Sequence, residues 1–201
     1  GGMGAYSPAP VVTADVHERI MNEVIYPTVR GMAAEGHPYK GFLYAGLMID
    51  TSGAPRVIEF NCRFGDPETQ PILLRMKSDI VELCQAAIDA NLDQCSSDWD
   101  ERAAVGIVLA AGGYPGSYNK GDAISGLPET DIEGEKAFHA GTTLNGNQVV
   151  TSGGRVLCAT ALGNTVTEAQ QRAYKLAEKI RWDGAFYRND IAYRAIAREK
   201  S

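Results

Sequence analysis

The first half of the chain alternates between helix-like and strand-like patterns of apolar residues. Residues 15–18 read Asp-Val-His-Glu and have the form of a capping box, so a helix is predicted from there to about Gly36. Two runs rich in aliphatic and aromatic residues, 41–50 and 56–63, flank turn-forming residues and predict an antiparallel hairpin. A second helix is predicted over residues 72–90, where apolar residues again recur at helical spacing.

The second half of the chain has a different texture, which begins after a polar and acidic stretch at residues 91–100. Residues 103–111 form a continuous apolar run that predicts a buried strand, and a tight turn is predicted directly after it. The pattern predicts an α+β fold with two domains, residues 1–100 and 101–201. The further elements predicted are short strands near residues 136–139, 149–150 and 155–161, and a helix from Thr165 or Thr167.

Composition removes several classes of function. The 201 residues carry a net charge of −6 and no cluster of Lys and Arg, so nucleic acid is not an expected partner. The longest apolar stretches are far shorter than the roughly 20 residues that a membrane-spanning helix needs, so no membrane partner is expected. The four cysteines form no CxxC pair, and Cys62 and Cys158 lie in predicted strands as small apolar residues. This cysteine usage favours a reduced, cytoplasmic protein.

Two polar residues interrupt the apolar strand predicted at residues 56–63. Residues i and i+2 of a strand point to the same face, so Glu59 and Asn61 are expected to project together, with Val57, from one side. Two oxygen donors side by side suit a hard cation such as Mg2+. The alternative, a half-buried strand with two polar residues facing solvent, stays open on the residues alone, although the apolar neighbours and the charged loop that follows argue against it.

Arg63 and the glycines at the start of the chain add weaker signals for anion binding. Arg63 is predicted to share the strand parity of the two polar residues, and its guanidinium can bind phosphate or carboxylate through two hydrogen bonds. An ion pair with Asp66 or Glu68 is the alternative for this side chain. Residues 1–8 read GGMGAYSP, a Gly-rich loop whose backbone N–H groups can approach an anion, although Gly-rich turns are common.

Four segments, taken together and in order, resemble one enzyme family. They are residues 1–8 (GGMGAYSP), 41–47 (GFLYAGL), 59–70 (EFNCRFGDPETQ) and 110–116 (AAGGYPG). Together they are similar to the phosphoribosylamine–glycine ligases of the bacterial type, also called glycinamide ribonucleotide synthetases, of the ATP-grasp superfamily. The similarity extends over essentially the whole chain, and the third segment is specific to this family within the superfamily.

The resemblance implies a fold and an activity. Residues 1–100 would be the C-terminal half of an ATP-grasp catalytic domain, an antiparallel sheet with flanking helices, and a small α+β C-terminal domain would follow. The family's N-terminal domain and mobile lid would precede Gly1, so we expect this chain to be a fragment that is inactive alone. The implied reaction joins glycine to 5-phosphoribosylamine through a glycyl phosphate, at the expense of ATP, and yields glycinamide ribonucleotide, ADP and phosphate in purine synthesis. Such chemistry depends on positioning and charge neutralisation more than on a protein nucleophile.

The resemblance also implies roles for individual residues. Glu59 and Asn61 match the family's ligands for Mg2+ or Mn2+, and Arg63 matches a catalytic position that faces the phosphates or the acyl phosphate. Met48 and Ile58 are expected to pack against the adenine of ATP. The residues expected to bind the other substrates are Gly2, Met3, Gly4, Tyr6, Ser7, Pro8, Asp66 and Glu68.

One departure from the wider superfamily stands out. Many ATP-grasp enzymes carry an additional acidic metal ligand on the strand before the Glu-x-Asn strand, whereas residues 44–48 here contain no carboxylate and the next is Asp50. The metal would then rest on Glu59, Asn61, the ATP phosphates and water. Two other interpretations stay open. One is another ATP-grasp carboxylate–amine ligase, against which the Arg-Phe-Gly-Asp-Pro-Glu loop argues, and the other is a non-catalytic module that binds a partner or the missing part of the same enzyme.

Overall fold

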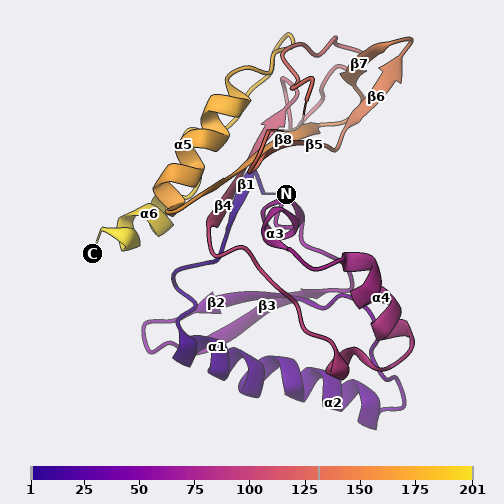
Figure 1. Ribbon diagram of the computed structural model, residues 1–201, viewed down its shortest axis with the longest axis vertical. Coiled ribbons are helices and arrows are strands. Elements are labelled where there is room, and N and C mark those ends of the chain that lie inside the picture. Colours follow the sequence, from indigo (N-terminus) through magenta and orange to yellow (C-terminus); the bar gives the residue numbers. More distant parts are fainter. Residues whose placement is uncertain (1, 131, 201) are drawn as a thin grey trace. The chain divides into compact units, whose positions relative to one another are not determined.

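The computed structural model describes residues 2–130 and 132–200, which form two compact units (Figure 1). The large unit contains residues 2–8, 66–76 and 100–200. The small unit contains residues 9–65 and 77–99. Residues 2–8 and 66–76 therefore belong to the same compact unit as the second half of the chain. The predicted division into domains at residue 100 describes how the family is organised, not which residues pack together, and it stays a prediction.

A four-stranded antiparallel sheet forms the centre of the large unit, in the order β1-β4-β8-β5. All eight residues of the central strand β4 are buried, and so are all but the first of β8. A strand that is apolar along its whole length requires cover on both faces of the sheet. The strands are β1 (Gly4–Ser7), β4 (Ala103–Ala110), β8 (Arg155–Gly163) and β5 (Glu135–His139).

Helices supply this cover from two sides (Figure 1). On one face, Ile107 and Leu109 of β4 join the hydrophobic core with Leu176 of α5 (Val166–Ala177). On the other face, Gly106 lies under α3 (Thr69–Arg75), because a Cβ atom on this glycine would lie 3.5 Å from Pro71 Cδ. Fully burying a side chain such as Leu or Ile contributes about 1.5–3 kcal/mol, so this three-layer core stabilises the unit.

The rest of the large unit lies around this core. A hairpin of β6 (Thr142–Asn145) and β7 (Gln148–Thr151) extends from it. The C-terminal helix α6 (Tyr193–Glu199) contacts α5. At the start of α5, the Thr165 hydroxyl accepts the Glu168 N–H and Glu199 of α6 accepts the N–H groups of Val166 and Thr167.

The small unit combines helices with one antiparallel hairpin, β2 (Tyr44–Ile49) and β3 (Pro55–Asn61). One continuous helical segment precedes the hairpin, and its middle turn is π-helical. Wider turns of this kind occur where a helix accommodates an irregularity, and here Pro27, which has no N–H, lies two residues after the turn. The remaining elements are α1 (Ala14–Ile20), the π turn (Met21–Ile25), α2 (Tyr26–Ala34), α4 (Ile80–Ile88) and a 3-10 turn (Leu92–Gln94).

Several sequence predictions are confirmed by these elements. The hairpin predicted at residues 41–50 and 56–63 is β2–β3, and the apolar run at residues 103–111 is β4. Thr165 caps the predicted helix, and the short strands predicted in the second half correspond to β5, β7 and β8. The fold class is therefore α+β with antiparallel sheets, as predicted.

Other predictions were wrong because contacts distant in sequence overrode the local pattern. Residues 4–7, predicted as a loop, form β1 on the edge of β4. The helix predicted over residues 72–90 is two helices, since the Lys77 N–H donates to the Asp98 carbonyl at 2.9 Å and Asp79 caps α4.

Two smaller corrections concern the first helix and a cysteine. The cap of α1 is Thr13, whose hydroxyl accepts the Val16 N–H at 3.3 Å, rather than Asp15. Cys62 lies just past the end of β3 and is exposed, whereas Cys158 is buried in β8 as predicted. Only Cys158 therefore acts as a small apolar core residue.

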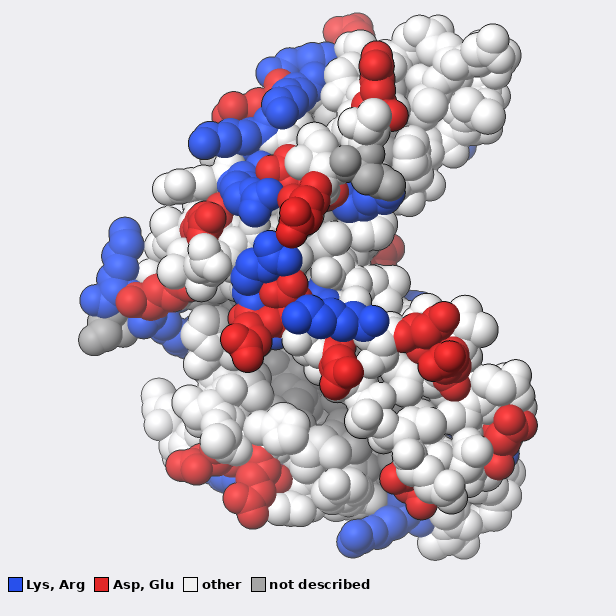
Figure 2. Space-filling model, in the orientation of Figure 1, with Lys and Arg blue, Asp and Glu red and all other residues white. Residues whose placement is uncertain are grey.

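The surface carries charges of both signs. On the face drawn in Figure 2, the acidic and basic side chains are interspersed rather than gathered by sign. Some charged side chains of the described residues form ion pairs, such as Arg172 with Glu135 at 3.1 Å. Within residues 2–130 and 132–200, no helix has the length and apolar character needed to cross a membrane.

Candidate functional site

The β2–β3 hairpin places the two predicted metal ligands on one face of its sheet. In the register, Glu59 lies opposite Gly46 and Asn61 lies opposite Tyr44. Directly opposed residues of antiparallel strands share a face, so Glu59 and Asn61 point to the same side. Gly46 leaves room there, because a Cβ atom at this position would lie 3.1 Å from Glu59 Cγ.

A one-residue shift in the register separates Val57 from Glu59. Gly46 pairs with Glu59 but Leu47 pairs with Val57, which leaves Ile58 without a partner on β2. An extra residue in one strand reverses the alternation of faces beyond it. The expectation that Val57 projects with Glu59 from one side is therefore wrong.

Met48 and Ile58, predicted to contact adenine, are the most exposed large apolar side chains of the hairpin, at 59% and 65%. Met48 is two residues from Gly46 on β2, so it lies on the face of Glu59. Exposed apolar side chains beside polar ones suit a bound molecule with a flat apolar ring and a charged tail. Contact with adenine stays a prediction.

Arg63 lies beyond the end of β3, in a bend. Its Nη1 donates to the carbonyl of Phe64 at 2.7 Å. The Phe64 ring stacks on Phe42 with centroids 3.9 Å apart, which holds this part of the loop against the preceding segment. Because the strand has already ended at Asn61, strand parity does not set the direction of the Arg63 side chain, contrary to expectation. Its catalytic role stays a prediction.

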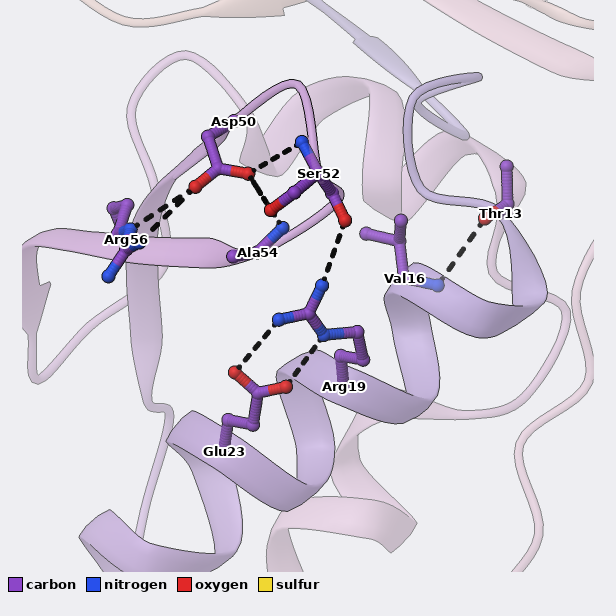
Figure 3. A network of polar contacts seen from close by, with 8 residues as sticks. All are labelled: Thr13, Val16, Arg19, Glu23, Asp50, Ser52, Ala54 and Arg56. Atoms are coloured by element: carbon purple, nitrogen blue, oxygen red, sulfur yellow. Dashed lines mark hydrogen bonds and ion pairs between the residues drawn. The ribbon is translucent and has the colours of Figure 1, made fainter.

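Asp50, the first carboxylate after β2, is committed to the turn of the hairpin (Figure 3). Its Oδ1 accepts hydrogen bonds from Ser52 N, Ser52 Oγ and Ala54 N at 2.9, 2.6 and 3.0 Å, and its Oδ2 pairs with Arg56 at 3.3 Å. The Ser52 hydroxyl is the largest cause that holds the pKa of Asp50 down to about 2. Asp50 therefore stabilises the turn and does not supply an additional metal ligand.

Arg19 of α1 joins this turn to the helix (Figure 3). Its Nε pairs with the Glu23 carboxylate at 2.6 Å, and its Nη1 donates to the Ser52 carbonyl at 3.1 Å. The hydrogen bond from Arg19 lowers the pKa of Glu23. The hairpin that carries Glu59 is thus anchored at its turn by a helix of the same unit.

In the large unit, the predicted substrate segment 2–8 runs along the edge of the sheet. Gly4 and Tyr6 pair with Ile107 and Val105 of β4. Gly4 has no room for a side chain, because a Cβ atom would lie 2.7 Å from the Gly106 carbonyl oxygen. This glycine therefore serves close strand packing rather than a loop of free N–H groups. The substrate contacts of Gly2, Met3, Gly4, Tyr6, Ser7 and Pro8 stay predictions.

Ser7 is held by an arginine that sequence reasoning did not single out. Arg75 Nη1 donates to Ser7 Oγ at 2.9 Å, and its other donors reach the carbonyls of Asp100 and Arg102. Glu68 lies at the N-cap of α3 and makes no side-chain capping bond there. The Ser7 hydroxyl therefore fixes the segment to α3.

Asp66 and Gly2 meet at a second arginine, Arg155 of β8. Arg155 Nη2 pairs with Asp66 Oδ2 at 2.6 Å, and Nη1 donates to the carbonyls of Gly2 and Asp66 at 3.0 and 3.2 Å. Gly2 also packs closely on Pro67, where a Cβ atom would lie 2.8 Å from Pro67 Cδ. Three segments that are distant in sequence are therefore joined at one guanidinium.

The donor set of the hairpin fits a metal that arrives with a nucleotide. Within the described ranges, no group of three or more His, Cys, Asp and Glu could hold a metal by itself. Glu59 and Asn61 supply one carboxylate and one amide oxygen. Mg2+ commonly keeps several waters and binds one or two carboxylates together with substrate phosphates, so this pair is a sufficient protein contribution.

The predicted site residues thus fall into two internally ordered groups. Glu59, Asn61, Met48, Ile58 and Arg63 lie in the small unit, and the other predicted substrate residues lie in the large unit. Sequence reasoning missed Arg75 and Arg155, because each acts through contacts 25 to 153 residues away. The two glycines before Arg155 were the one local sign in the sequence that other atoms lie close to the start of its strand.

Comparison with protein families matches two parts of the chain. Residues 1–69 match the model described as phosphoribosylglycinamide synthetase, ATP-grasp (A) domain. Residues 104–194 match the model described as phosphoribosylglycinamide synthetase, C domain.

Curated relatives match over the whole chain. The phosphoribosylamine–glycine ligase of Vibrio vulnificus strain YJ016 is 75% identical over 200 residues, which cover 100% of this chain and 47% of the relative. The enzyme of the same name from Yersinia pestis is 69% identical over 201 residues, with the same shares. The chain spans about half the length of the curated relatives it matches.

Solved structures share the fold. The phosphoribosylamine–glycine ligase of Thermotoga maritima has a TM-score of 0.79 and 37% identity, over 95% of this chain and 46% of that chain. The biotin carboxylase domain of the Hydrogenobacter thermophilus 2-oxoglutarate carboxylase, solved with MgADP and bicarbonate, has a TM-score of 0.61 and 16% identity, over 92% and 40%. At that identity the second likeness concerns the fold alone, and both agree with the ATP-grasp architecture expected from the sequence.

Proposed function

Because the chain belongs to the phosphoribosylglycinamide synthetase family, we propose that it supplies the metal-binding hairpin and the C-terminal domain of a phosphoribosylamine–glycine ligase. The proposed reaction is ATP + glycine + 5-phosphoribosylamine → glycinamide ribonucleotide + ADP + phosphate, a step of purine synthesis in the cytoplasm. The proposed domains are residues 1–100, part of the ATP-grasp domain, and residues 101–201. The rest of the ligase, on the N-terminal side, is the proposed partner of this chain.

The observation that carries this proposal is that Glu59 and Asn61 of β3 point to the same face of the sheet. Glu59 lies opposite Gly46, whose missing side chain leaves the carboxylate space to turn toward a ligand. The two side chains would hold Mg2+, or Mn2+ in its place, between the protein and the phosphates of ATP. Such a metal neutralises charge on the transferred phosphoryl group.

The other residues would bind and orient the reactants. Met48 and Ile58 offer an apolar surface to the adenine ring, and Arg63 offers a guanidinium to the phosphates. The glycine carboxylate would attack the γ-phosphate to form glycyl phosphate, and the amine of phosphoribosylamine would then displace phosphate from the carbonyl carbon. Asp66 and Glu68 are the proposed contacts of the amine substrates, together with the segment 2–8.

A chimera tests the proposal in a protein of full length. This chain replaces the matching region of the Vibrio vulnificus ligase, which is 75% identical there. We expect the chimera to release ADP in repeated turnovers only when both glycine and phosphoribosylamine are present. A chimera that folds and makes no glycinamide ribonucleotide would contradict the proposed function.

Glu59→Gln in the same chimera tests the metal assignment. Partners that only support a metal ligand cost 10–100-fold when they are lost, so a direct ligand should cost at least about 100-fold in kcat/KM for Mg-ATP. The Mg2+ concentration for half-maximal rate should rise as well. Glu23→Gln, a change of an exposed carboxylate of the same unit, is the matched control. A Glu59→Gln enzyme within about threefold of the parent would remove Glu59 from the ligand set.

A further inference from the structure

Arg155 lies where the large unit brings together two separate parts of the proposed substrate site. Its three hydrogen bonds reach the Gly2 carbonyl, the Asp66 carbonyl and Asp66 Oδ2, at 3.0, 3.2 and 2.6 Å. The partners are 153 and 89 residues away in sequence. One side chain thus sets the position of both segments relative to the sheet.

The backbone that carries Arg155 is bound to neighbouring segments at the start of β8. Arg155 pairs with Ala110 of β4, and its carbonyl accepts the Gly141 N–H at 3.0 Å. The preceding Gly154 is covered by two aromatic rings, since a Cβ atom there would lie 2.4 Å from Tyr114 Cδ2. A guanidinium that projects from such a fixed strand end has a defined direction, as a positioning group requires.

In the described part of the chain, Arg155 contacts the Asp66 carboxylate through one oxygen. Its Oδ2 is engaged by Arg155, while Oδ1 has no hydrogen-bond partner among the described residues. The Asp66 side chain is 59% exposed, whereas that of Arg155 is 20% exposed. Arg155 therefore holds the carboxylate through one oxygen while more than half of the side chain is exposed, an arrangement that suits a substrate ammonium or hydroxyl donor.

We propose that Arg155 is a positioning residue that orients the Asp66 carboxylate, and the adjoining start of the chain, toward the amine substrate. This inference rests on the proposed ligase function. Arg155 acts through Asp66 and takes no part in the transfer of the phosphoryl or glycyl group. Loss of an orienting contact can shift a reacting group by about 1 Å, which can cost about 100-fold in rate.

A double-mutant cycle in the chimera tests this role. Arg155→Gln and Asp66→Asn should each lower kcat/KM for phosphoribosylamine by about 100-fold and leave the KM for Mg-ATP within about threefold. If Arg155 acts through Asp66, kcat/KM of the double variant should be no more than about threefold below that of the less active single variant. A double variant whose loss in kcat/KM equals the two single losses multiplied together would overturn the proposal. An Arg155→Gln enzyme within threefold of the parent would overturn it as well.

Arg172→Gln is the matched control. Arg172 also pairs with one carboxylate, Glu135, and donates to two carbonyls, those of Leu162 and Glu133. A merely structural role predicts that both arginine variants lower the melting temperature and leave the kinetics alike. We expect only Arg155→Gln to change kcat/KM, and equal kinetic losses in the two variants would contradict the proposal.

Two further arms keep the test decisive. If Arg155→Gln does not fold, Arg155→Lys replaces it, since a single ammonium cannot serve three acceptors arranged around a planar fork. It should lose at least about tenfold in kcat/KM, and parental kinetics would overturn the proposal. An inactive parental chimera would instead contradict the proposed ligase function, so the two failures are distinguishable.

Discussion

Replacing Glu199 with alanine should remove the acceptor for two backbone N–H groups at the start of α5. In the native unit, the Glu199 carboxylate accepts the N–H groups of Val166 and Thr167 and the Thr167 hydroxyl, the last two at 3.1 and 3.0 Å. Thr165 Oγ1 accepts the next N–H, that of Glu168, at 3.1 Å. Together the two side chains satisfy the donors that a helix leaves unpaired at its first turn.

The cost of the change follows from these contacts. Val166 is only 3% exposed, and a buried N–H left without a partner costs about 1–3 kcal/mol. Loss of a negative charge near the positive end of a helix adds about 0.3–1 kcal/mol at the surface. Glu199 itself is exposed, and water can reach the Thr167 N–H, so we expect about 2 kcal/mol for Glu199→Ala. Glu199→Gln keeps an acceptor and loses the charge, and it should cost about half as much.

Tryptophan fluorescence can isolate this effect. The chain has two tryptophans, and Trp182 belongs to the core of the large unit at 7% exposure. In a Trp99→Phe background, urea unfolding followed at Trp182 reports on that unit. Glu178→Ala, at the other end of α5, is the control and should change the free energy of unfolding by less than about 0.5 kcal/mol. A Glu199→Ala variant as stable as this control would refute the reasoning.

Further predictions concern titration and backbone space. Burial raises the pKa of the Cys158 thiol to about 11. Cys62 should therefore react with a thiol reagent in the native protein while Cys158 reacts only after unfolding. The unfolded thiol ionises near pH 9. The free energy of unfolding of the wild type, minus that of Cys158→Ala, should therefore fall by about 2–3 kcal/mol between about pH 9 and 11. Asp50 should titrate near pH 2 in a carboxyl NMR experiment, because its hydrogen bonds in the turn favour the ionised form. Its contribution to stability is present above about pH 4 and lost as the pH falls toward 2, and an ordinary titration near 4 would contradict the turn network. Gly126→Ala should lower the free energy of unfolding by about 2–3 kcal/mol, since φ is +75° and a Cβ atom would lie 1.9 Å from the Lys179 carbonyl oxygen. Gly121→Ala is the control, because φ is +92° there but no atom lies near the Cβ position, and it should cost about 1 kcal/mol or less in thermal unfolding.

The elements that sequence patterns predicted are those whose local periodicity matches their burial. β4 is apolar at every position because helices cover both faces of its sheet, and α5 has an apolar stripe with Thr165 as its cap. The break between α3 and α4 has no proline or glycine to mark it. It depends on hydrogen bonds from Lys77 to Asp98 and from Asp100 to Arg75, which no local pattern encodes.

The placement of two candidate side chains on one sheet face was predictable because strand geometry is regular there. Glu59 and Asn61 share a face because the register between them is unbroken, and the same rule failed at Val57, where Ile58 has no partner. Such a shift depends on how two strands pair, which a single strand's sequence does not reveal. The role of Arg155 was not predicted, because its three bonds reach segments at the start and in the middle of the chain.

The early segments that join the large unit have a consequence for how the protein can be divided. Residues 9–65 and 77–99 behave as two insertions into the large unit, so its core forms only after long loops have closed. Pairing of β1 with β4, about a hundred residues apart, gives the unit a high contact order, and slow folding is expected. The family region 104–194, expressed alone, would lack both β1 and α3. It would expose the β4 edge and the apolar face beneath Pro71, which makes aggregation rather than autonomous folding the expected result.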